Sequence, residues 1–184
     1  MFAKAMIFEL SLLLVAWVVA WFFSIPFWGS GSWDWMGVLV GLTSTLPMLS
    51  IFFWLLQSKW DACVEIRKMM DQAILPLFKG FSVTQIALLS ITAGISEEVL
   101  FRAVIQGGIQ AAAGLPLAIF VSAFLFGLCH ALTRFYFILA SLIGVYLSMV
   151  WMATDQLLSP IITHAVYDFI VLHWYLRLRV SPNY

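Results

Sequence analysis

Six ionisable side chains suited to chemistry fall in three short patterns within otherwise apolar sequence. They are Glu97, Glu98 and Arg102 in the first pattern, His130 in the second, and His164 with Asp168 in the third. Carboxylates and imidazoles are common proton acceptors and donors in enzymes, and an arginine can hold a carboxylate in place. The set therefore indicates acid–base chemistry, provided that the fold brings the three patterns together.

In the first pattern, Glu-Glu-x-x-x-Arg, the two carboxylates are predicted to have different surroundings. On a helix, Glu98 and Arg102 are i,i+4 neighbours in the favourable orientation, so we predict that they pair. Glu97 points about 100° away around the helix axis and finds no cation there. A buried carboxylate without a cation is suited to accept a proton. We therefore predict that Glu97 is free to act as a base. A purely structural ion cluster would explain Glu98 and Arg102 but not Glu97.

The other two patterns are weaker alone. In Phe126-x-x-x-His130 both side chains share one helix face, but a lone histidine on an apolar helix is usually a packing residue. In His164-x-x-x-Asp168 the carboxyl group, one turn away, can hold the imidazole or reach the same cavity. A structural pair is the alternative for this last pattern.

The composition indicates that the elements carrying these residues lie in a membrane. Hydrophobic residues make up 64% of the 184 residues and charged residues only 10%, whereas a soluble domain carries about 25% charge. The formal net charge is zero, which gives no indication of a nucleic-acid partner. Cys63 and Cys129 show neither metal-type nor disulfide-type spacing. We expect one membrane domain over residues 1–184, surrounded by membrane lipid.

A bilayer core is crossed by about 20 apolar residues in helical form. Six stretches meet this requirement: Ala5–Trp28, Trp35–Leu56, Val83–Ala113, Leu115–Leu132, Phe135–Ala153 and Gln156–Leu176. The third is over-long, and we predict a break or tilt near Gly94 or Gly107-Gly108. Glu9, near the inner end of the first stretch, is interpreted as a structural residue that can snorkel towards the interface.

Residues 57–82 form the only sizeable polar segment. Their apolar positions recur near helical spacing and are accompanied by basic residues, which predicts an interfacial amphipathic helix kinked before Pro76. A plain loop is the alternative. The predicted fold is all-α, a polytopic membrane bundle of about six transmembrane helices plus this interfacial helix. Residues 1–56 provide two spans, residues 57–82 a cytoplasmic segment, and residues 83–184 the core that carries the motifs.

The basic residues predict the orientation. With six spans and a cytoplasmic N-terminus, the positive-inside rule is satisfied because every basic loop residue falls on the cytoplasmic side. These residues are Lys4, Lys59, Arg67, Lys68, Lys79, Arg134, Arg177 and Arg179. Both termini are therefore predicted to be cytoplasmic.

The third and fourth spans should form a hairpin at Gly114-Leu115-Pro116. The midpoint between Glu97 and His130 falls beside Gly114. Two antiparallel helices folded there bring Glu97 and His130 to nearly the same depth.

The three motifs, in this order on hydrophobic helices, resemble the CAAX protease and bacteriocin-processing family. Its members are glutamate intramembrane proteases and include the type II CAAX prenyl endopeptidases. The resemblance runs from about Phe81 to the C-terminus, whereas the first two spans carry no motif. It implies a helical bundle with a cavity in the membrane, and peptide hydrolysis that needs no metal or other cofactor.

Carried over by this resemblance, Glu97 would activate the water and His130 would help to position it. His164 and Asp168 would stabilise the oxyanion, while Glu98 and Arg102 would shape the site. Where family members have Asn at the last motif position, the amide donates directly. Asp168 can donate only when protonated, so we expect it mainly to orient His164.

The implied substrate is a peptide or protein with a membrane-associated segment, processed near its C-terminus and either lipidated or membrane-anchored. The implied location is a prokaryotic inner membrane. One alternative is a zinc protease, since Glu97, Glu98, His130 and His164 are zinc ligands by type. The others are non-enzymatic: a bacteriocin immunity or interaction protein, or a proton-coupled transporter, which also uses intramembrane Glu, His and Arg. A transporter is disfavoured because the sequence shows no internal symmetry.

Overall fold

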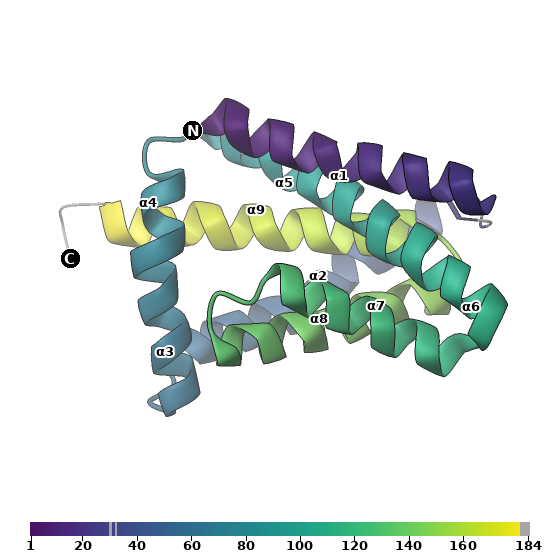
Figure 1. Ribbon diagram of the computed structural model, residues 1–184. Coiled ribbons are helices and arrows are strands. Elements are labelled where there is room, and N and C mark those ends of the chain that lie inside the picture. The colour runs from purple at the N-terminus through teal and green to yellow at the C-terminus, as the bar shows by residue number, and fades with distance from the viewer. Residues whose placement is uncertain (30, 32, 181–184) are drawn as a thin grey trace.

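The computed structural model describes residues 1–29, 31 and 33–180, apart from the side chains of residues 179 and 180. Over these ranges the chain forms helices and no β-strand, which confirms the predicted all-α class. The helices are α1 (Phe2–Phe23), α2 (Trp35–Gln57), α3 (Asp61–Met69), α4 (Leu75–Phe78), α5 (Val83–Glu98), α6 (Gly107–Ala113), α7 (Leu115–Cys129), α8 (Arg134–Thr154) and α9 (Leu158–Val180). Two π-helical segments, η1 (Met70–Ile74) and η2 (Val99–Gln106), join α3 to α4 and α5 to α6. The long helices run along one axis, and α3–α4 crosses one end of the bundle (Figure 1).

Every predicted span corresponds to a helix or a continuous helical run. Among the described residues, α1, α2 and α8 are each long and apolar enough to cross a membrane alone. A fourth candidate joins Asp61–Phe78 to Val83–Ala113, with a bend of 111° between them. The helix α7 has only 15 residues, about 22 Å at 1.5 Å per residue. The molecule is a helical membrane bundle, and the number of six crossings stays a prediction.

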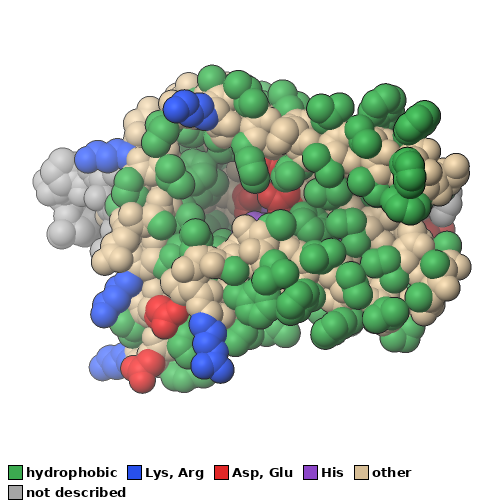
Figure 2. All heavy atoms as spheres, in the orientation of Figure 1, with side chains coloured by type: hydrophobic (Ala, Val, Ile, Leu, Met, Phe, Trp, Pro, Cys, Tyr) green, Lys and Arg blue, Asp and Glu red, His purple; other side chains and the backbone are tan. Residues whose placement is uncertain are grey.

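The outer surface of the bundle is apolar along its length. On α1, the side chains of Ile7, Phe8 and Leu14 are 67%, 59% and 60% exposed. Figure 2 shows hydrophobic side chains over the flanks, while Lys and Arg gather at the end where α3 and α4 lie. So large an exposed apolar surface is stable only against lipid or another apolar partner.

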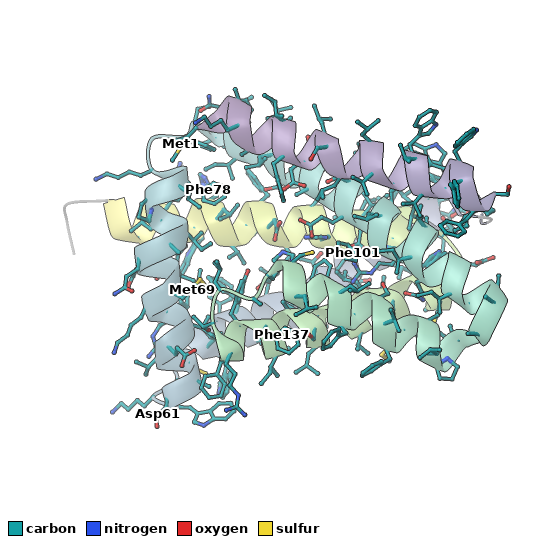
Figure 3. All side chains as sticks on the ribbon, in the orientation of Figure 1. Met1, Asp61, Met69, Phe78, Phe101 and Phe137 are labelled. Carbon is teal, nitrogen blue, oxygen red and sulfur yellow. The ribbon has the colours of Figure 1, made fainter. Side chains whose placement is uncertain are left out.

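The helical run α3–η1–α4 occupies the segment that was predicted to be interfacial and amphipathic. Its buried side chains, including Cys63, Ile66 and Met70, pack on Phe52 of α2 and Val171 of α9. The labelled Met69 and Phe78 mark this crossing helix in Figure 3. The π-helical segment η1 lies where the kink was predicted, and Pro76 follows it as the second residue of α4. Because proline has no N–H, Pro76 donates no backbone hydrogen bond back into η1.

The over-long third span is one helical run whose geometry changes inside it. The change to π-helix occurs at Val99 and the return to α-helix at Gly107. Gly94, one of the two predicted break points, interrupts nothing. It instead allows α5 to approach α9, because a Cβ at Gly94 would lie 2.9 Å from the Cβ of Ala165. This close contact between α5 and α9 positions His164, the residue that precedes Ala165.

At the opposite end of the bundle, Asp34 and Gln156 join α2 to the start of α9. Asp34 caps α2 by accepting from the backbone N–H groups of Met36 and Gly37. The amide of Gln156 donates to Asp34 Oδ1 at 2.9 Å, and its Oε1 accepts from the Asp34 N–H at 3.1 Å. The hydrogen bond from Gln156 holds the pKa of the Asp34 carboxyl below its usual value. This clamp sets α9 in register with α2.

Candidate active site

An ion pair between Glu98 and Arg102 lies at the centre of the bundle. Arg102 Nη1 is 3.0 Å from Glu98 Oε1, and both side chains are fully buried. Arg102 Nη2 also donates to the carbonyl oxygen of Gly144 on α8 at 3.0 Å. The guanidinium stacks on Phe126 of α7, 4.6 Å from the ring centroid. The predicted pairing of Glu98 with Arg102 is confirmed. The further contacts of Arg102 link η2 to α7 and α8.

Glu98 also holds His164 of α9. The imidazole Nδ1 is 2.8 Å from Glu98 Oε1. Because a carboxylate paired with arginine only accepts, Nδ1 carries the hydrogen. Asp168 Oδ2 lies 3.5 Å from the other nitrogen, Nε2, at the outer limit of a hydrogen bond. The closer of the two carboxyl groups that can orient His164 is thus that of Glu98, whereas the sequence predicts this role for Asp168.

His130 follows the last residue of α7 and caps that helix. Its Nδ1 is 2.8 Å from the carbonyl oxygen of Phe126, and the two rings stack with centroids 4.6 Å apart. Since a carbonyl can only accept, Nδ1 donates, and the neutral ring leaves Nε2 as an acceptor. Phe126 thereby selects both the plane and the tautomer of His130.

Glu97 faces His130 across a short gap. Its Oε2 lies 3.7 Å from His130 Nε2, which confirms the predicted equal depth of the two residues. Among the described residues, Glu97 Oε2 has no hydrogen-bond partner. Two acceptors at this distance cannot bond to each other, but each can accept one O–H of the same water molecule. Such a water would direct its lone pairs away from both groups.

The π-helical segment η2 begins directly after Glu98. The N–H of Val99 is shared between the carbonyl oxygens of Ile95 and Ser96, and the register has changed by Gly107, whose N–H bonds to the carbonyl oxygen of Arg102 five residues back. Ser122 of α7 donates to the carbonyl oxygen of Phe101 at 2.7 Å. Phe101 lies in the middle of the bundle (Figure 3), with its ring centroid 5.2 Å from that of Phe126. π-Helical turns often occur at functional sites, and this one packs α7 beside the two glutamates.

A cavity of about 240 Å³ adjoins these groups. His130, His164 and Asp168 line it, and the rest of its wall is mainly apolar side chains of α2, α3, α8 and α9. A second cavity of about 230 Å³ shares Phe52 and Tyr167 with the first and lies between α2 and α8. Figure 2 shows acidic side chains and a histidine at the floor of a hollow between α1 and α5 on one side and α7 on the other. A larger cavity, near Ile25 and Asp155, contains none of the six residues.

The interpretation of Glu9 is corrected in one respect, the direction of its side chain. Glu9 does not snorkel: it is only 9% exposed, and it accepts a hydrogen bond from Ser96 Oγ at 2.7 Å. Burial of this carboxylate inside the bundle is consistent with the general behaviour of ionisable residues in membrane spans, which mostly face the interior. The contact of Glu9 with α5 could not be predicted from the sequence, because the first span carries no motif that relates it to α5.

Within the described ranges, no three His, Cys, Asp or Glu side chains are grouped so that they could hold a metal ion. Of the zinc ligands considered by type, Glu98 already binds Arg102 and His164 through the same oxygen.

Comparison with known protein families identifies the family of this chain. The family model described as type II CAAX prenyl endopeptidase, Rce1-like, matches residues 79–170. The matched segment is half of the 184-residue chain and contains all six candidate residues. No curated protein and no solved structure matches the chain.

Proposed function

This chain belongs to the Rce1-like family of type II CAAX prenyl endopeptidases, and on this premise we propose that it hydrolyses peptide bonds with a water activated by Glu97. The family is one of proteases, and the apolar helices make the chain an integral membrane protein. The observation that carries the proposal is the 3.7 Å gap between Glu97 Oε2 and His130 Nε2. This gap supports a water held by both acceptors, beside the largely apolar cavity lined by His130 and His164.

In the proposed reaction, the bound water donates one hydrogen to Glu97 and the other to His130. Glu97 takes the first proton as the water oxygen bonds to the peptide carbonyl carbon. The π electron pair of the carbonyl bond moves to the carbonyl oxygen, which becomes the oxyanion. When the tetrahedral intermediate collapses, the carbon–nitrogen bond breaks and Glu97 returns the proton to the leaving nitrogen. The products are a carboxylic acid and an amine, so no further reactant is needed.

His164 is the proposed donor to the oxyanion. With Nδ1–H held by Glu98, a protonated ring presents Nε2–H on the side of Asp168 and the cavity. A preorganised donor at this place is worth about 10²–10³ in kcat. Asp168 supports the imidazolium charge from that side, and Arg102 keeps Glu98 in position.

The proposed substrate has a membrane-associated segment and is processed near its C-terminus, with a lipid or an apolar anchor. The apolar walls around His130 and His164 support this class, because they suit a hydrophobic tail beside the scissile bond. The proposed location is a prokaryotic inner membrane.

The direct test uses purified protein in lipid bilayers and two quenched fluorescent peptides ending in Cys-aliphatic-aliphatic-X. One peptide carries a farnesyl group on the cysteine, and its twin carries an apolar anchor segment instead. Cleavage of at least one peptide is expected. If both stay intact while the protein is folded, a non-enzymatic role becomes the better account.

Activity is expected to survive strong chelation, because the proposed mechanism assigns water activation to Glu97. The measurement is the cleavage rate before and after treatment with excess EDTA and a zinc-specific chelator. Loss of activity that added zinc restores would instead assign Glu97, His130 and His164 to ligand roles.

Both termini are expected on the cytoplasmic side, together with α3–α4. The gathering of Lys and Arg at the α3–α4 end of the bundle supports this orientation (Figure 2). Reporter fusions after Tyr184 and within the 29–34 loop should score on opposite sides; Tyr184 and loop residues 30 and 32 lie outside the described residues. Scores on the same side would contradict the six-span arrangement.

A further inference from the structure

The helix α1 contributes a carboxylate to the interior of the bundle, from outside the segment matched by the family model. Its buried residues are Glu9, Ala16 and Ala20, which share the face that packs on α5 and η2. At the two alanines this face is closely packed and apolar. Glu9 occupies the same face nearer the start of the helix, where burying a carboxylate costs free energy that an apolar side chain would not.

Glu9 accepts a hydrogen bond from the hydroxyl of Ser96, which also has an acceptor within its own helix. Ser96 Oγ donates to Glu9 Oε2 at 2.7 Å and lies farther, at 3.2 Å, from the carbonyl oxygen of Ala93 in its own helix. A serine inside a helix commonly satisfies itself with such a carbonyl. Neither the packing of α1 nor the hydrogen bonding of Ser96 therefore explains why a glutamate stands at position 9.

Ser96 directly precedes Glu97, at the turn where the helix changes type. The α-helical hydrogen-bond pattern of α5 ends here, and the helix continues as a π-helix from Val99, so a continuous α-helical ladder does not hold this turn. Glu97 Oε2 itself has no hydrogen-bond partner among the described residues. The direction of the Glu97 carboxylate consequently depends on how firmly the backbone beneath it is held.

We infer that Glu9 is a positioning residue for Glu97: by holding Ser96, it fixes the turn of α5 that aims the base at His130. The inference rests on the proposed function, because it assigns Glu97 the role of base. Glu9 lies on a second helix, so rotation of this turn of α5 would break the hydrogen bond, and the bond therefore opposes that rotation. The two carboxylates are close enough to interact electrostatically, yet Glu9 is assigned no contact with the substrate.

The test compares Glu9→Leu, Ser96→Ala and the double variant with the unmodified protein, on whichever of the two quenched peptides that protein cleaves. Each single variant should lower kcat about 10- to 100-fold, as a misplacement of about 1 Å does, and should change KM less than about two-fold. The double variant should be no worse than the more damaging single, because both remove one hydrogen bond. Glu9→Gln should restore most of kcat, since its amide oxygen can accept from Ser96.

Ser11→Ala is the matched control on the same helix. The Ser11 hydroxyl is exposed and donates only within α1, to the carbonyl oxygen of Phe8 at 2.6 Å, so its loss should leave kcat and the melting temperature unchanged. If Glu9→Leu does not fold, the milder Ser96→Ala decides the matter.

The possible outcomes distinguish failure of the positioning role of Glu9 from failure of the proposed proteolytic function. A Ser96→Ala protein that retains the full kcat overturns the positioning role, as does a melting temperature that falls while kcat per folded molecule stays constant. If the unmodified protein and Ser11→Ala both fail to cleave either peptide, the proposed function fails and the positioning role falls with it.

Discussion

Replacement of Glu97 by glutamine is expected to lower kcat by about 10²–10⁴-fold, the usual contribution of a general base, while the protein stays folded. The amide keeps the shape of the side chain but cannot take a proton from water. Among the described residues, Glu97 Oε2 forms no hydrogen bond, so little structure depends on its charge. The loss should therefore appear in kcat and not in KM.

The measurement is a cleavage assay beside a melting curve of the purified variant. Glu65→Gln is the control, because Glu65 is a half-buried carboxylate on α3, away from the six candidate residues, and its change should leave kcat intact. A Glu97→Gln protein that cleaves at the normal rate would remove Glu97 from the role of base.

Glu98→Gln is expected to destabilise the protein by about 3–5 kcal/mol, the usual effect of removing one partner of a buried ion pair. One oxygen of Glu98 serves both Arg102 and His164. A neutral amide oxygen can accept from them, but it leaves the guanidinium charge uncompensated in the centre of the bundle. Both α5 and α9 should lose part of their attachment, and activity should fall together with the melting temperature.

Ser148→Ala provides the comparison for a neutral group at the same burial. Ser148 Oγ donates to Gln106 Oε1 at 2.7 Å and is also 2.9 Å from the Gly144 carbonyl oxygen. Its removal should cost about 1–3 kcal/mol, the usual penalty for a buried polar group left without a partner. Two results together would reverse the assignments of Glu97 as the base and Glu98 as the structural carboxylate. They are a Glu98→Gln protein that is as stable as Ser148→Ala but inactive, and a Glu97→Gln protein that is unfolded.

Local spacing was enough to predict some of these relations. The pairing of Glu98 with Arg102 follows from i,i+4 spacing on an α-helix, and it survives the change to π-helix at Val99. The approach of Glu97 to His130 follows from arms of equal length on either side of Gly114. Membrane character follows from the charged fraction alone, because too few charged residues are present to cover a soluble globule.

Contacts between distant helices could not be read in the same way. The hydrogen bond from His164 to Glu98 joins residues 66 positions apart, and the rotation of α9 that permits it is set by close packing at Gly94 and by the Asp34–Gln156 clamp. From sequence, Asp168 was the evident partner of His164, because only the neighbour one turn away is visible to helical periodicity.

The sequence by itself determined the membrane class, the helical elements and the residue types available for acid–base chemistry, because hydropathy and helical spacing are local properties. Only the tertiary structure decided that Glu98 holds His164 in addition to Arg102, that α3 and α2 close the apolar cavity beside the histidines, and that Glu9 accepts a hydrogen bond from Ser96. Each of these depends on how one helix is rotated against another. That rotation results from the summed packing of all the helices, which no single segment encodes.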